Sequence, residues 1–248
     1  MRLTRVHVEA PLAAGKRVVI EGSAANHITR VLRLRAGDSI AVFNGTGTEF
    51  AASIGEFRKD CVLVDVKDER ATDRESPLSI VLAQGISRGE RMDWILQKAT
   101  ELGVSRIVPL TTERSVVRLD SKQAEKKVQH WRGIAIAACE QCGRNRVPEV
   151  TLPTDVFEFI GSTNAPGTTR LLLSPAADVS IDQVTAGASG VSVLIGPEGG
   201  LTETEHETAL RSGFSSVRMG PRVLRTETAA IAALTILQHR FGDLGNRP

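Results

Sequence analysis

Three short segments contain proline and polar residues, and two of them also glycine, at points where apolar, strand-like runs end. Glycines let a ligand approach the main chain without an intervening side chain, and prolines restrict the loop conformation. Such loops could hold a flat nucleoside through main-chain amides, although a Gly-Pro turn after a strand is as often purely structural. The segments are Leu173-Ser174-Pro175-Ala176, Ile195-Gly196-Pro197-Glu198-Gly199-Gly200 and Met219-Gly220-Pro221-Arg222-Val223-Leu224-Arg225-Thr226-Glu227-Thr228.

Motifs of better-known nucleotide and metal sites are missing from the sequence. It has no G-x-x-x-x-G-K-[ST] phosphate loop, and His206-Glu207 has no second histidine at position 210, so the zinc-protease motif fails. Cys139 and Cys142 form C-x-x-C, but no second pair exists and a helix is expected to end there. This favours partly buried thiols over a redox or zinc site.

The elements that would position the three segments alternate between strand and helix patterns. Thr202 and Glu205 have the spacing of a capping box, and Gly103 is expected to close the helix that precedes it. The alternation predicts an α/β fold with a mostly parallel sheet, and such sheets bind ligands at the carboxyl ends of their strands. Strands are expected at 78–84, 106–110, 170–173, 191–195 and 215–219, and helices at about 92–102, 121–139, 203–211 and 228–239.

The first part of the chain has a different pattern. Short alternating segments from about 18 to 67 are separated by Gly, Asn and Asp, which is strand spacing. Asn44-Gly45 between two such runs predicts a type I′ hairpin. Because the polar stretch 71–77 ends in proline and reads as a linker, we expect a β-barrel over 1–72 and a second domain over 73–248.

The last helix is apolar nearly all round, from Ala229 to Leu237. Such a helix must be covered on more than one side, so it is either deeply buried or part of a subunit interface. We expect a homodimer that forms through this C-terminal helix.

Composition and charge limit the class of protein. Over 248 residues, 41% hydrophobic and 24% charged residues are typical of a globular chain. Residues 88–146 carry twelve Lys or Arg against seven Asp or Glu, whereas 147–248 carry seven against eleven. The basic middle suits an anionic polymer such as RNA, and ordinary solvated helix faces explain it equally well.

No part of the sequence is typical of a membrane span or a secretion signal. No apolar run reaches the roughly 18 to 20 residues that a span needs. The first residues, Met1 to His7, lack the apolar stretch of a signal peptide. We expect a cytoplasmic protein without membrane contact.

Five blocks, in order along most of the chain, carry a family resemblance: 84–104, 113–115, 140–149, 195–202 and 220–229. They resemble the 16S ribosomal RNA uridine-N3 methyltransferases of the SPOUT superfamily, the ribosomal RNA small subunit methyltransferase E family. Two departures are Cys142, where the family pattern has serine, and Arg88, where lysine is common. Both keep the size or the charge of the usual residue.

The resemblance implies a C-terminal SPOUT domain with a trefoil knot, an N-terminal PUA-like RNA-binding barrel and an active site at a dimer interface. It also implies that the three loops bind S-adenosylmethionine and that the substrate is 16S rRNA within the small ribosomal subunit. The expected cofactor-binding residues are Leu173, Ser174, Pro175, Ile195, Gly196, Pro197, Gly199, Gly200, Met219, Gly220, Arg222, Leu224, Thr226 and Thr228.

Two residues are candidates for catalysis. Loss of the uracil N3 proton spreads negative charge onto the neighbouring carbonyl oxygens, which the Arg225 guanidinium could stabilise. Glu198 could accept the proton or orient the cofactor. The structural alternatives are a helix N-terminal charge for Glu198, and a salt bridge to Glu227 or phosphate for Arg225.

RNA would be held mainly through its phosphates. The candidate contacts are Arg30, Arg33, Arg35, Arg88, Arg91, Arg114, Arg118, Arg144 and Arg146. Two other functions stay open: a SPOUT enzyme that acts on transfer RNA or another rRNA site, and a non-catalytic RNA-binding module. Binding of the cofactor would distinguish an enzyme from the non-catalytic RNA-binding module.

Overall fold

The computed structural model describes residues 3–115, 119–162 and 166–245, which form two compact units. Unit 1 comprises Met1–Glu75 and Ile136–Val147, and unit 2 comprises Ser76–Ala135 and Pro148–Pro248. Helix α3 (Ser121–Cys142) therefore contributes its last turns to unit 1. The expected domain border between 72 and 73 stays a prediction.

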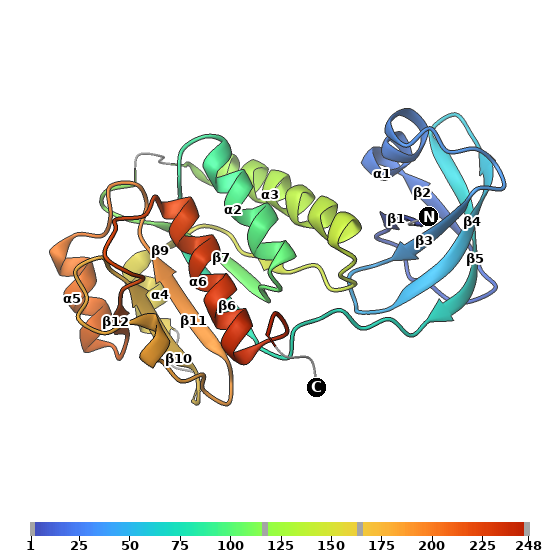
Figure 1. The fold of residues 1–248 in the computed structure, drawn as a ribbon. Helices are drawn as coiled ribbons and strands as arrows, with labels where there is room; N and C mark the ends of the chain where they lie inside the picture. Colours follow the sequence, from blue (N-terminus) through green and yellow to red (C-terminus); the bar gives the residue numbers. More distant parts are fainter. Residues whose placement is uncertain (1–2, 116–118, 163–165, 246–248) are drawn as a thin grey trace. The chain divides into compact units, whose positions relative to one another are not determined.

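Unit 1 is built on a curled five-stranded sheet in the order β1-β3-β4-β5-β2 (Figure 1). Strand β1 pairs parallel with β3, and the other pairings are antiparallel. Alternate residues such as Ile40, Val42 and Val64 point into one apolar core, which Ile28 completes. The elements are β1 (Thr4–His7), β2 (Arg17–Glu21), α1 (Gly22–Asn26), the π-helix η1 (His27–Val31), β3 (Ser39–Phe43), β4 (Glu49–Phe57) and β5 (Cys61–Arg70).

The predicted hairpin forms, but its turn differs from the prediction. Strands β3 and β4 pair antiparallel, with Phe43 opposite Glu49, so the loop is longer than a two-residue type I′ turn. Gly45 and Gly47 have positive φ, whereas Asn44 does not. The type I′ prediction is wrong because two glycines in a longer loop reverse the chain.

Unit 2 contains a parallel sheet in the order β12-β10-β11-β6-β7-β8, with β9 also paired to β7. All of the pairings recorded within this sheet are parallel, which confirms the predicted α/β class. The strands are β6 (Ile80–Gly85), β7 (Arg106–Thr111), β8 (Glu149–Val150), β9 (Thr154–Asp155), β10 (Thr169–Leu173), β11 (Val191–Ile195) and β12 (Ser215–Val217).

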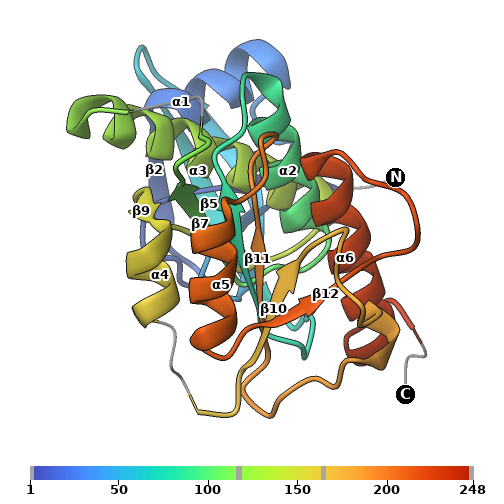
Figure 2. The ribbon, with the colours of Figure 1, turned by 90° about the vertical axis from the view of Figure 1, so that its left-hand side faces the viewer.

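Helices cover both faces of this sheet (Figure 2). Ile80 and Leu82 of β6 belong to the core that α2 (Glu90–Glu101) and α6 (Thr226–Phe241) complete. Their neighbour Ala83 points to the other face, where it meets α4 (Val156–Ser162) and α5 (Glu203–Arg211). A short 3-10 helix, η2 (Ile181–Gln183), follows β10. Strands buried on both faces explain the continuous apolar runs in the sequence.

The predicted helix ends are mostly confirmed. The hydroxyl of Thr202 accepts from the Glu205 amide, and the Glu205 carboxylate accepts from the Thr202 amide, so the capping box opens α5 as expected. Gly103 has φ +79° directly after the last turn of α2. Helix α6 begins two residues before the predicted start, and α3 ends three residues beyond its predicted end.

Helix α6 is covered on one side within the chain. Ala230, Ala233, Leu234 and Leu237 are buried, and the helix packs against α2. Thr228 and Thr235 on its outer side are exposed. Among the described residues, no helix has the length and apolar character needed to cross a bilayer.

Candidate functional site

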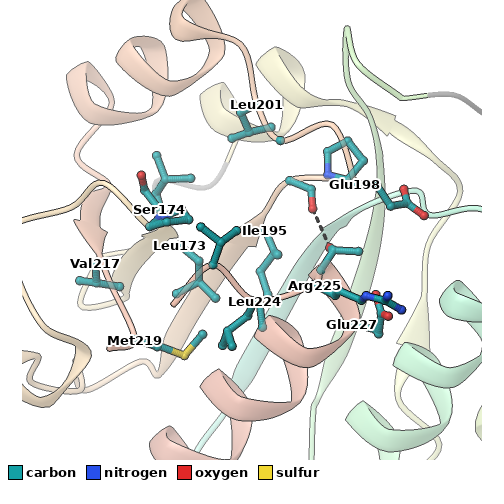
Figure 3. Close-up of a pocket in the computed structure, with 18 of the residues that line it drawn as sticks. Leu173, Ser174, Ile195, Glu198, Leu201, Val217, Met219, Leu224, Arg225 and Glu227 are labelled. Carbon is teal, nitrogen blue, oxygen red and sulfur yellow. Dashed lines mark hydrogen bonds between the residues drawn. The ribbon is translucent and has the colours of Figure 1, made fainter. Parts of the chain in front are cut away.

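The three predicted loops meet at one edge of the unit 2 sheet. Strands β10, β11 and β12 are parallel, with Leu172 opposite Leu194 and Leu173 opposite Val217, so their carboxyl ends lie together. The loops that follow them enclose a pocket of about 590 Å³ (Figure 3). In the sheet order, β10 lies between β12 and β11. The pocket therefore lies outside the carboxyl ends of adjacent parallel strands, which is where open α/β sheets bind ligands.

Most of the predicted cofactor residues line this pocket. Gly199 and Thr228 are the exceptions. Gly199 packs against the side chain of Arg114, and Thr228 lies exposed on α6. The residues that do line it are Leu173, Ser174, Pro175, Ile195, Gly196, Pro197, Gly200, Met219, Gly220, Arg222, Leu224 and Thr226.

One side of the pocket is apolar. Leu173, Ile195, Met219 and Leu224 gather around it (Figure 3). Glycines at the loop bends leave main-chain groups accessible beside these side chains, and Gly220 has φ +71°. An apolar wall next to main-chain donors and acceptors suits a flat heteroaromatic ring.

Glu198 connects two loops at the pocket. Its carboxylate accepts from the Arg88 amide at 3.0 Å and from the Arg91 guanidinium at 2.9 Å. Burial by itself would raise the pKa of Glu198, but hydrogen bonds from its own amide, from the Arg88 amide and from Arg91 outweigh burial. The pKa of Glu198 is therefore held below its usual range, and the carboxylate stays ionised at neutral pH.

Arg225 precedes the first turn of α6 and lines the pocket. Its side chain is exposed and makes no ion pair or hydrogen bond within the described part of the chain, so the suggested bridge to Glu227 does not form. Glu227 also lines the pocket, and its Oε2 atom is buried without a hydrogen-bond partner in the described residues. A cation and an anion thus stand on the same wall without pairing.

Several pocket residues were not expected from the sequence. Arg91 was predicted as an RNA contact, yet it lines the pocket and pairs with Glu198. His206, which bonds Ser216 at 3.3 Å, directly follows Glu205 of the capping box. Only its place near the 195–202 block could have indicated it. The other lining residues outside the expected cofactor-binding set are Leu172, Leu201, Val217, Val223, Glu227 and Ala229.

The predicted phosphate contacts divide into exposed and engaged arginines. Arg144 is only 6% exposed, and its guanidinium bonds Glu75 at 2.7 Å. It cannot reach a phosphate in this conformation, so that prediction is wrong. Arg114 is exposed but donates to the carbonyl oxygens of Gly199 and Leu201. Arg30, Arg33, Arg35, Arg88 and Arg146 are exposed, and Arg118 lies outside the described residues.

The C-x-x-C cysteines, Cys139 and Cys142, lie in the last turns of α3. All three cysteines are free, and the described residues contain no cluster of His, Cys, Asp or Glu that could hold a metal ion. Burial raises the pKa of the Cys139 thiol to about 12. A thiol that stays protonated and buried is inert.

A G-x-S-x-G spacing, which presents a nucleophilic serine in some hydrolases, occurs at 85–89. Here Ser87 is 4% exposed, and its hydroxyl donates to the Gly85 carbonyl oxygen at 3.4 Å. A buried hydroxyl bonded to the main chain is not an available nucleophile, so the spacing has a structural role.

Two family models, both of RNA methyltransferase domains, match the chain. Residues 74–238 match the family model of an RNA methyltransferase domain, and residues 20–66 match that of an RNA methyltransferase PUA domain. A ribosomal RNA small subunit methyltransferase E from Buchnera aphidicola is 36% identical over 98% of both chains.

Two solved structures are also similar over nearly the whole chain. A methyltransferase from Legionella pneumophila with bound SAM is 41% identical, covers 98% of this chain and 100% of its own, and superposes with a TM-score of 0.94. A ribosomal RNA small subunit methyltransferase E from Neisseria gonorrhoeae, bound to S-adenosyl methionine, is 36% identical with the same coverage and a TM-score of 0.91.

Proposed function

Because this chain belongs to the ribosomal RNA small subunit methyltransferase E family, we propose that it transfers the methyl group of S-adenosylmethionine to N3 of a uridine in 16S ribosomal RNA. Its cofactor is S-adenosylmethionine, and its activity is methylation of small-subunit ribosomal RNA. The uridine, the N3 atom and the 16S molecule are the parts that we propose.

The observation that carries the proposal is the convergence of three loops on one pocket of about 590 Å³. The residues present fit the cofactor. Leu173, Ile195 and Leu224 offer an apolar surface to an adenine ring, and the carboxylates of Glu198 and Glu227 complement a positively charged methionine portion. The buried and unpaired Oε2 of Glu227 supports a cationic ligand nearby.

Arg225 is our candidate for stabilising charge on the substrate. When bound, S-adenosylmethionine supplies an activated methyl group. Uracil N3 becomes nucleophilic as its proton passes to solvent water, and the negative charge then moves onto the carbonyl oxygens. The exposed and unpaired Arg225 guanidinium stands on the pocket wall, where it could donate to such an oxygen.

For Glu198 we propose an orienting role. Its pKa is held below the usual range, which makes it a weaker base than a free carboxylate. Its bonds to Arg88 and Arg91 join the segment after β6 to the loop after β11. Glu198 would therefore hold one pocket wall in place and leave Arg91 directed toward the ligand.

The RNA would be bound by the exposed arginines of each unit. Arg30, Arg33 and Arg35 lie in or just after η1 of unit 1, which falls within the PUA family match. Phosphate contacts of this kind position RNA without reading its sequence and weaken with added salt. An activity on ribosomal RNA would place the protein in the cytoplasm, on the rRNA itself or the assembling small subunit.

Two features of the resemblance complete the proposal. We expect the three loops after β10, β11 and β12 to form a trefoil knot, and two copies to associate through the outer side of α6. Thr228 and Thr235 are exposed there, and Ile231, Ala232 and Ile236 are half-buried. Light scattering of the purified protein would measure the second expectation.

Nucleoside analysis of 16S rRNA from cells with and without this protein tests the proposed function. We expect 3-methyluridine to disappear with the gene and to return with the wild-type copy. The loss of a different methylated nucleoside, or of one from transfer RNA, would assign the enzyme another target. Unchanged nucleosides together with no cofactor affinity would favour the non-catalytic RNA-binding module.

A further inference from the structure

A buried amide connects three segments that are far apart in the sequence. Gln84, next to the end of β6, is fully buried. Its Nε2 donates to the Thr226 hydroxyl at 2.9 Å and to the Gly85 carbonyl oxygen at 3.0 Å, with a longer contact of 3.4 Å to the Gly196 carbonyl oxygen. The Thr226 hydroxyl in turn donates to the Gly196 carbonyl oxygen at 2.7 Å.

Two of these residues belong to the pocket, and Gln84 does not. Gly196 begins the loop after β11, and Thr226 is the first residue of α6. Both line the pocket, whereas Gln84 lies behind them. The hydrogen bonds of Gln84 and Thr226 therefore determine how far the β11 loop stands from the start of α6.

The carbonyl oxygen of the Gln84 side chain indicates that this residue positions the loops and does not serve only to stabilise the fold. The Oε1 atom of Gln84 is buried and has no hydrogen-bond partner among the described residues. An unpaired buried acceptor destabilises a fold, so a position selected for stability alone would favour an apolar side chain. We propose that Gln84 is a positioning residue that shapes the cofactor pocket through Thr226 and Gly196. This inference rests on the proposed function, because it takes S-adenosylmethionine as the ligand.

Gln238 provides a matched control in the same unit. It is also fully buried, and its amide donates to the Leu102 carbonyl oxygen at 2.8 Å and accepts from the Ser76 hydroxyl at 2.6 Å. It lies in the last turn of α6, at the opposite end from Thr226, and does not line the pocket. Replacing it removes a similar buried network without touching the loops.

The experiment compares Gln84→Met, Thr226→Val, their double variant, Thr226→Ser and Gln238→Met. Titration calorimetry measures the Kd for S-adenosylmethionine and S-adenosylhomocysteine, and thermal unfolding gives Tm. We expect Gln84→Met and Thr226→Val each to weaken binding about tenfold, because each removes a buried hydrogen bond that holds a loop. The double variant should be no weaker than the worse single variant, since both act through one network.

The remaining variants separate positioning from general stability. Thr226→Ser keeps the hydroxyl and should recover most of the affinity that Thr226→Val loses, whereas Gln238→Met should lower Tm without changing either Kd. In turnover assays, Gln84→Met should raise KM for the cofactor and leave KM for RNA unchanged. If Gln84→Met does not fold, the Val and Ser variants of Thr226 decide the question.

Three results would overturn the inference while the wild type binds both nucleosides. They are wild-type affinity in Gln84→Met and Thr226→Val, additive losses in the double variant, or an equal loss of affinity in Gln238→Met. If the wild type binds neither nucleoside, the proposed function itself fails, and the inference fails with it.

Discussion

A β-carbon added to Gly85 would lie 2.4 Å from the backbone nitrogen of Pro197. Only glycine therefore lets the end of β6 lie against the loop that follows β11. Gly85→Ala should push that loop away and weaken S-adenosylhomocysteine binding by at least about tenfold. Calorimetry would measure the loss.

Gly133→Ala is the matched control for this substitution. A β-carbon there meets nothing within 4 Å, and the residue lies inside α3. Alanine should leave the affinity unchanged and raise the stability by up to about 1 kcal/mol. Equal affinity in the two variants would mean that the close approach does not shape the pocket.

Arg225→Ala should lower kcat by roughly 100-fold and leave cofactor binding nearly unchanged, because the guanidinium is proposed to act on the substrate. Rapid-quench turnover with unmodified 16S rRNA gives kcat, and calorimetry gives the Kd. Arg211→Ala removes an exposed arginine of α5 that bonds only Glu207 and Thr208 within the described residues, and should keep full activity. Near-normal turnover in Arg225→Ala would remove this residue from the mechanism.

Glu198→Gln should reduce the acid sensitivity of cofactor binding. The folded-state pKa of Glu198 is lowered, so its ion pair with Arg91 is present above the ordinary carboxyl pKa and is lost as pH falls through the lowered value. Wild-type affinity should be level near neutral pH and fall below about pH 4.5.

The effect of Glu198 should be modest because both side chains are partly exposed, at 45% for Arg91 and 26% for Glu198. A weakening of about fivefold or less is expected for Glu198→Gln at pH 7. Calorimetry from pH 7 to pH 3 measures both profiles. A wild-type profile that matches the variant at every pH would contradict the orienting role.

Replacing Arg30, Arg33 and Arg35 together by alanine should weaken RNA binding similarly for different sequences. Each lost phosphate contact should also reduce the slope of log K against log salt by about 0.7 to 0.9. Filter binding over a salt series measures both. Arg58→Ala removes another exposed arginine of unit 1, paired with Glu56, and serves as the control. An unchanged slope in the triple variant would show that these three arginines do not contact RNA phosphates.

Cys139 should resist alkylation in the folded protein. With its pKa at about 12, only about one thiol in ten thousand is ionised at pH 8, against roughly a tenth for an ordinary thiol. Since the raised pKa belongs to the folded state, its contribution to stability is present below about pH 9 and is lost as pH rises toward 12. Peptide mapping after iodoacetamide treatment should find the half-exposed Cys61 modified first. Equal rates would show that Cys139 is accessible.

Local chemistry was readable directly from the sequence. The Thr202–Glu205 capping box, the glycine that ends α2 and the strand periods depend on residues a few positions apart, and they appear as predicted. The Gly-Pro loops were recognisable for the same reason, because glycine widens and proline narrows the backbone conformations available wherever they occur.

The partners of those local elements were decided only by the tertiary structure. The place of β10 between β12 and β11 brings the three loops together, and no periodicity specifies strand order. Arg144 and Arg91 have the same charge in the sequence, yet one is buried against Glu75 and the other pairs with Glu198. The free energy of a charge depends on its burial and on neighbours distant in sequence, so the chain alone could propose these arginines but could not assign their roles.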